Sequence, residues 1–207
     1  MPYQFNAALS FISNRGRAPV SFLTELLDWG ATAPADIFAP NLVSCDAYAV
    51  IKSKLGTKTG NDVSSTPVYV WESLKHRRAA MLELMRVHAG LESSWDWGEG
   101  VDTMNKRSMA NKTGEETGIF QVSFDSSYLG SPEGKNILRP FVKTHGIDTP
   151  EKFIIAMKRD HKLALEYYAR LVRVSIQWAG PFLRHGIDSV YPYLKRDSMR
   201  EIMQYLA

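Results

Sequence analysis

The sequence predicts a mainly α-helical protein of 207 residues. In several segments, apolar residues recur at three- and four-residue steps, which is the spacing of a helix with one buried face. Proline or a hydroxyl residue precedes several of these segments and glycine follows some of them, as is typical of helix ends. Only residues 67–71 and 118–122 have the composition of short strands. We therefore expect a helical fold with little sheet.

The helical segments are separated by loops of unequal length. We expect helices over residues 19–30, 44–55, 74–92 and 149–174, and a last one that starts at Asp197. Residues 56–67 are almost all turn formers and predict an exposed loop. This loop divides the chain into an N-terminal helical extension, residues 1–66, packed on the core, and a main domain, residues 67–207.

The composition excludes several classes of protein. A net charge of +3, from 25 basic and 22 acidic residues, is too small for the dense basic face of a nucleic-acid-binding protein. No apolar stretch approaches the roughly 20 residues that span a membrane. The first residues lack the features of a secretory signal, so we expect synthesis in the cytoplasm. The single cysteine, Cys45, and five histidines without ligand spacing predict no internal disulfide, no metal and no cofactor.

The acidic residues are concentrated in one segment. Residues 92–125 contain seven acidic and three basic residues, a net charge of −4, which leaves +7 for the rest of the chain. Most of this segment is rich in Ser, Gly, Asn, Asp and Thr, and long polar loops inside compact domains are usually functional. The basic remainder favours approach to an anionic cell envelope. We therefore expect the functional site in or beside the acidic segment.

Glu92 is the acid that we single out, because it ends an apolar helix, one residue after Leu91 and three before Trp95. Apolar neighbours raise the proton affinity of a carboxyl group, which then serves as a general acid near neutral pH. Glycoside cleavage needs such an acid and a second group across the scissile bond. Candidates for the second group are Asp102, Glu115 and Glu116. Two alternatives remain open: a solvated acidic face and a calcium site.

Two motifs in this segment resemble a known signature. The stretch Leu91-Glu92-Ser93-Ser94-Trp95, followed by Thr117-Gly118-Ile119-Phe120-Gln121-Val122-Ser123, is similar to that of the lysozyme-like superfamily, in particular goose-type lysozymes and soluble lytic transglycosylases. A later element of that family, Tyr-Asn-Ala-Gly-Pro, resembles Gln177-Trp178-Ala179-Gly180-Pro181. The three elements occur in the family's order and span about residues 77–185, more than half of the chain.

The resemblance implies a lysozyme-like helical fold, with a short β-hairpin or loop at the active-site cleft of a catalytic domain, residues 67–207. It implies that Glu92 is the catalytic acid, with Ser93 as its support, and that one wall of a sugar cleft is formed by Gly118, Ile119, Phe120 and Gln121. We also expect contacts with the sugar from Ser123, Trp95, Gln177 and Trp178.

The chain also departs from the family. Ser123 stands where goose-type lysozymes can carry an aspartate that holds the attacking water. The Tyr-Asn pair of the transglycosylases is replaced by Gln177-Trp178, so an assisting tyrosine would have to come from elsewhere, from Tyr167, Tyr168, Tyr191 or Tyr193. The acidic segment and the missing tyrosine favour hydrolysis over transglycosylation.

The resemblance therefore implies a muramidase that cleaves the β-1,4 bond between N-acetylmuramic acid and N-acetylglucosamine in peptidoglycan. The alternatives are a lytic transglycosylase, a chitin-cleaving glycosidase and a non-catalytic glycan-binding module of a phage tail or secretion machine. Such an enzyme would act in the periplasm or cell wall, as a phage endolysin or as a secreted antibacterial effector. An effector would have an immunity or inhibitor protein and a secretion or chaperone partner.

Overall fold

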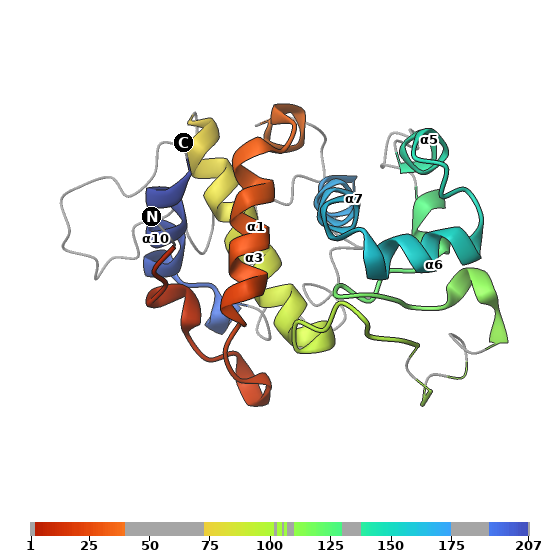
Figure 1. Cartoon of the computed structure of the whole chain (residues 1–207), viewed down its shortest axis with the longest axis horizontal. Coiled ribbons are helices and arrows are strands. Elements are labelled where there is room, and N and C mark those ends of the chain that lie inside the picture. Colours follow the sequence, from red (N-terminus) through yellow and green to blue (C-terminus); the bar gives the residue numbers. More distant parts are fainter. Residues whose placement is uncertain are drawn as a thin grey trace.

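The computed structural model describes residues 3–39, 73–101, 103–104, 106, 110–129, 138–174 and 191–206. This part of the chain is mainly helical, as predicted (Figure 1). Its α-helices are α1 (Val20–Thr32), α3 (Leu74–Ser93), α5 (Leu138–Thr144), α6 (Pro150–Arg159), α7 (His161–Val174) and α10 (Arg196–Tyr205). Its 3-10 turns are η1 (Ala7–Leu9), η2 (Ser13–Arg15), η3 (Ala35–Phe38), η4 (Lys112–Gly114), η5 (Phe124–Tyr128) and η7 (Tyr191–Tyr193).

Three predicted helices are confirmed. Helices α1 and α3 begin and end close to the bounds that the sequence predicts, and α10 begins close to its predicted start. The predicted helix over 44–55, the loop over 56–67, the strand over 67–71 and the domain boundary after residue 66 lie outside the described residues. Among the described helices, none has the length and apolar character that crossing a membrane requires.

The prediction of one continuous helix over 149–174 is wrong. The chain leaves the helix at Asp160, which has φ −101° and ψ 87°, so that α6 and α7 are separate helices. The Asp160 carboxylate accepts a hydrogen bond from the backbone N–H of Leu163 at 3.0 Å, which caps the start of α7. The apolar spacing continues across this point, so the sequence pattern does not reveal the break.

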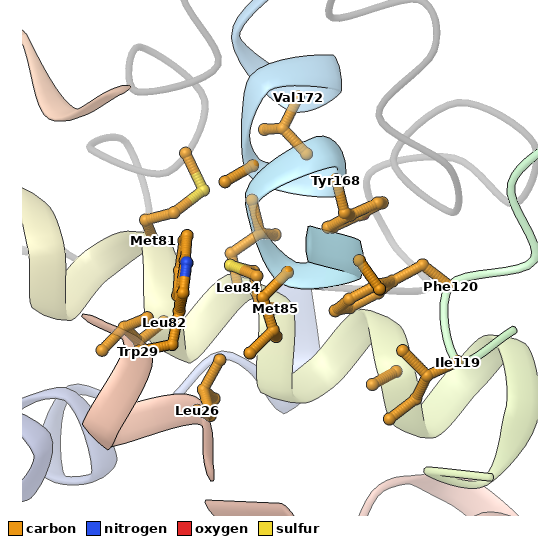
Figure 2. Close-up of a cluster of buried hydrophobic side chains, with 14 of the residues drawn as sticks. Leu26, Trp29, Met81, Leu82, Leu84, Met85, Ile119, Phe120, Tyr168 and Val172 are labelled. Atoms are coloured by element: carbon orange, nitrogen blue, oxygen red, sulfur yellow. The ribbon is translucent and has the colours of Figure 1, made fainter. Parts of the chain in front are cut away.

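Helix α3 lies at the centre of the fold. Every residue from 79 to 90 is buried, because neighbouring elements cover α3 on several sides. Figure 2 shows Leu26 and Trp29 of α1 on one side of α3, and Tyr168 of α7 on another. Ile119 and Phe120, from the end of the acidic segment, belong to the same core. The end of α3 is therefore held firmly against the rest of the molecule.

The described N-terminal segment is fixed to the last helix. The carboxylate of Glu201 on α10 accepts hydrogen bonds from the backbone N–H groups of Asn6, Ala7 and Ala8, at 2.6, 3.2 and 2.8 Å. The Tyr205 hydroxyl also hydrogen-bonds the backbone near the start of the chain. Hydrogen bonds to a charged acceptor are stronger than neutral ones. The two ends of the described chain consequently pack together, and α1 lies next to α3 and α7.

Candidate active site

Glu92 lies in the last turn of α3 and is half-buried. Soon after it the helix ends, because Ser94 and Trp95 take left-handed backbone conformations with φ of 57° and 64°. The backbone N–H groups of Ser94 and Trp95 donate back to the carbonyls of Gly90 and Ala89, both at 3.1 Å. These bonds satisfy carbonyl groups that the helix end would otherwise leave unpaired. They place Glu92 at a well-defined helix end.

The Trp95 side chain fixes the same helix end by packing against it. It is only 5% exposed, and its indole N–H donates to the Arg86 carbonyl at 3.0 Å. A Cβ at Gly90 would lie 2.6 Å from the Trp95 ring, so glycine is the residue that leaves room for it. Against the expectation of a sugar contact, Trp95 therefore lies in the core. It supports the helix end and offers no free ring face.

Residues 117–122, which we call the bridged turn, lie beside the end of α3. Thr117 and Val122 form an antiparallel bridge, with backbone hydrogen bonds of 3.0 and 3.1 Å in the two directions. The stretch with strand composition is therefore a tight turn. The Gln121 side chain closes it by donating to the Gly118 carbonyl at 3.0 Å.

Ser93 joins the bridged turn to the helix that carries Glu92. Its buried hydroxyl donates to the carbonyl of Ile119 at 2.8 Å and lies 3.1 Å from the carbonyl of Ala89. The side chains of Ile119 and Phe120 are buried, so the turn is anchored in the core as well. The two motifs that resemble the lysozyme-like signature are thus in direct contact in the folded chain.

A cavity of about 150 Å³ lies between the end of α3, the bridged turn, η5 and α7. Its lining combines apolar side chains with a few polar groups, which is the usual character of a ligand site. The lining residues are Glu92, Phe120, Gln121, Val122, Ser123, Asp125, Ser126, Leu129, Tyr168 and Leu171. Glu92, Phe120, Gln121 and Ser123 are predicted site residues, and the fold brings all four to this cavity.

Tyr168 is the candidate tyrosine that the fold brings to the cavity. Its ring stacks on Phe120, with ring centroids 3.9 Å apart and planes 5° from parallel, and it meets His88 edge-on at 5.6 Å. The Tyr167 hydroxyl instead hydrogen-bonds Ser126, and burial raises the pKa of the Tyr167 phenol well above its usual range.

Of the two further candidate tyrosines, the structure describes the side chain of one. The Tyr191 side chain lies outside the described part of the chain. Tyr193 is half-buried and is not among the residues that line the cavity. Among the candidate tyrosines whose side chains the structure describes, Tyr168 is therefore the one that lines the cavity.

The buried His88 next to Tyr168 carries no charge at neutral pH. Burial lowers the pKa of the imidazole to about 3, since a low-dielectric environment penalises the protonated ring. His88 therefore does not place a positive charge near Glu92. Within the described residues, no group of three or more His, Cys, Asp or Glu side chains is arranged to hold a metal ion.

Three acids were predicted to assist Glu92. The two of them that the structure describes do not line the cavity. Glu115 pairs with Lys112 at 2.7 Å, and Glu116 is half-buried but not among the lining residues. Asp102, like Gln177 and Trp178, lies outside the described residues.

Among the described residues, Asp125 is the acid that lines the cavity with Glu92, and the sequence motifs did not select it. Asp125 is exposed and lies in η5, directly after the bridged turn. Its position two residues after Ser123, at the end of the second motif, is the signal that could have identified it.

A second cavity, of about 610 Å³, lies where α1 faces the junction of α6 and α7. His161 in its wall hydrogen-bonds Glu25 and stacks on Trp97, with ring centroids 3.8 Å apart. Trp97 is therefore held by α7, and it is not among the residues that line the first cavity. Neither Glu92 nor the bridged turn lines this second cavity, so we take the first as the candidate active site.

Replacing Gly118 with alanine should destabilise the protein by about 2–4 kcal/mol, because the left-handed backbone conformation and a steric clash of the new Cβ both disfavour alanine. Gly118 has φ +70°, and a Cβ there would lie 2.7 Å from the backbone carbonyl oxygen of Met157. Gly146→Ala is the matched control, since Gly146 has φ +66° and nothing within 4 Å of its Cβ position. It should cost only about 1–2 kcal/mol. Urea unfolding of both variants measures the difference, and equal costs would show that the contact with Met157 is unimportant.

The comparisons with known proteins leave the family of this chain open. The chain matches no protein-family model, no curated protein and no solved structure. The functional argument therefore depends on the residues around the first cavity.

Proposed function

We propose that this protein is a peptidoglycan glycoside hydrolase, a muramidase that cleaves the β-1,4 bond between N-acetylmuramic acid and N-acetylglucosamine with Glu92 as general acid. The observation that carries the proposal is that Glu92 and the bridged turn line one cavity, although they are distant in sequence. These are the two elements that resemble the lysozyme-like signature. In the proposal the helical fold is lysozyme-like, and the bridged turn is the hairpin wall of the sugar cleft.

The chemistry of the cavity supports this assignment. Glycoside cleavage needs a carboxylic acid beside the scissile oxygen and groups that hold the sugar in place. Glu92 supplies the acid from a helix end that Ser93 and Trp95 hold rigidly. Apolar side chains of the lining give a surface for the apolar face of a sugar ring, and Gln121 and Ser123 offer hydrogen-bonding groups.

A lytic transglycosylase is the second candidate, and the position of Tyr168 favours it. The Tyr168 side chain is 2% exposed, and its hydroxyl has no hydrogen-bond partner among the described residues. A buried hydroxyl without a partner costs free energy, so such a group is often functional. In a transglycosylase the sugar's own 6-hydroxyl attacks, so no second carboxylate is needed. Tyr168 would then be the tyrosine that assists Glu92.

Digestion of purified peptidoglycan by the wild-type protein tests the proposal. A muramidase should release muropeptides with new reducing ends, whereas a transglycosylase should release products with 1,6-anhydro ends, and mass spectrometry distinguishes the two. Polymers of N-acetylglucosamine serve as the comparison substrate, because their cleavage alone would indicate a chitin-cleaving enzyme. Binding of peptidoglycan without any release of fragments would contradict the enzyme and favour a glycan-binding module.

In this proposal the enzyme acts in the periplasm or cell wall, as a phage endolysin or as an antibacterial effector. An effector needs an immunity protein that protects the producing cell, and an inhibitor that fills the cavity at Glu92 would do so. A secretion machine or chaperone would then be a further partner.

A further inference from the structure

We propose that Asp125 is the second carboxylate of the site and the base that activates the attacking water. This inference rests on the proposed hydrolase function and assigns the role that the sequence left open among Asp102, Glu115 and Glu116. Of the described acidic residues, Glu92 and Asp125 are the two that line the 150 Å³ cavity. Glu115 is instead engaged by Lys112, outside the lining.

The backbone around Asp125 is held on both sides, while the residue itself is exposed. Asp125 lies in η5, between Phe124, which is buried, and Ser126. The Phe124 ring packs edge-on against Phe153, with centroids 5.8 Å apart, and the Ser126 hydroxyl hydrogen-bonds Tyr167 of α7. A catalytic group on a fixed backbone loses little entropy when the substrate binds. Asp125 therefore combines a fixed position with access to water.

The cavity has room for the water that this role requires. A cavity needs about 10–15 Å³ of space open to a water molecule to hold one water, so 150 Å³ leaves room for a water beside a reacting sugar atom. Ser123 belongs to the same lining and provides a further polar group for this water, whereas the Ser126 hydroxyl is already hydrogen-bonded to the Ser123 carbonyl and to Tyr167. The site can therefore hold a water molecule that interacts with Asp125 and with a serine hydroxyl.

The reaction balances with these two carboxyl groups. Glu92 gives its proton to the glycosidic oxygen, and the bond from this oxygen to C1 of the muramic acid breaks. A water oxygen forms the new bond to C1 from the face of the sugar opposite the leaving oxygen, while a proton of that water passes to the Asp125 carboxylate. The products are a reducing end and a free 4-hydroxyl, and exchange of protons with solvent restores both carboxyl groups. Attack from the opposite face inverts the configuration, so the first product is the α-anomer.

Asp125→Asn should reduce the rate of reducing-end release by about 10²- to 10⁴-fold, which is the usual contribution of general base catalysis. Asp197→Asn is the matched control, because Asp197 is also an exposed aspartate but lies on α10, paired with Arg200. It should retain the wild-type rate. Both variants should unfold at the same urea concentration as the wild type, which separates a loss of chemistry from a loss of fold.

Rescue by azide distinguishes a catalytic role of Asp125 from a purely structural one. In Asp125→Ala, added azide should restore cleavage and yield a glycosyl azide, since this small anion attacks C1 without a base. NMR of the wild-type reaction should show the α-anomer as the first product.

The outcomes separate this inference from the proposed function. If the wild type releases reducing ends and Asp125→Asn is as fast, Asp125 is not the base, although the hydrolase stands. A β-anomer as first product, or 1,6-anhydro ends only, also overturns the role of Asp125, since neither product requires a base opposite Glu92. If the wild type releases no fragments at all, the proposed function fails first, and the role of Asp125 falls with it.

Discussion

Glu92→Gln should reduce muropeptide release by about 10²- to 10⁴-fold, because the amide cannot donate the proton that the leaving oxygen needs. Glutamine has nearly the same shape as glutamate, and Glu92 is only half-buried at the end of α3. The variant should therefore fold like the wild type and still bind glycan. Initial rates on purified peptidoglycan, followed by chromatography of the soluble fragments, measure the effect.

Glu151→Gln is the matched control for this measurement. Glu151 is an exposed glutamate in the first turn of α6 and is not part of the cavity lining. It should release fragments at the wild-type rate. If Glu92→Gln is equally fast, Glu92 is not the general acid, and the assignment of the site is wrong.

Glu83→Ala should lower the free energy of unfolding by about 3–5 kcal/mol, because it leaves a buried arginine without its counter-charge. The side chains of Glu83 and Arg86 are both 0% exposed and form a bidentate pair with two bonds of 2.7 Å. The Glu83 carboxylate also accepts hydrogen bonds from the Ser198 hydroxyl and, at 2.8 Å, from the backbone N–H of Lys195. The pair thus joins α3 to the start of α10.

Urea unfolding measures this effect, and Glu166→Ala is the control. Glu166 pairs with Arg170 at 2.8 Å on α7, but both side chains are 21% exposed. An ion pair near the surface contributes only about 0–1 kcal/mol, so this variant should be close to wild type. A similar small loss in Glu83→Ala would show that the buried pair does not hold α10 on α3.

Local sequence patterns were sufficient for the helices that begin and end on clear signals. The apolar stripe of α3 and the turn-forming residues after it placed Glu92 correctly at a helix end. The same patterns failed at Asp160, where a single side chain caps a new helix without disturbing the apolar spacing. They also could not separate Trp95 in the core from a tryptophan on the surface, because its burial depends on the ring folding back onto α3, against Gly90 and the Arg86 carbonyl.

The amino-acid sequence was enough to predict the helical character of the protein and to select Glu92 and the 117–122 segment. The helical character and the position of Glu92 at a helix end are local properties, since helix formation depends on residues a few positions apart. The 117–122 segment was selected by its resemblance to the lysozyme-like signature. Phe120, Gln121 and Ser123 were expected beside Glu92, but the role of Asp125 in the lining and the choice of Tyr168 among the candidate tyrosines became known only from the folded chain. Asp125 and Tyr168 reach that cavity from η5 and α7, and Glu115 does not. This difference arises because the lining depends on how the helices pack, which is set by contacts between residues far apart in the chain.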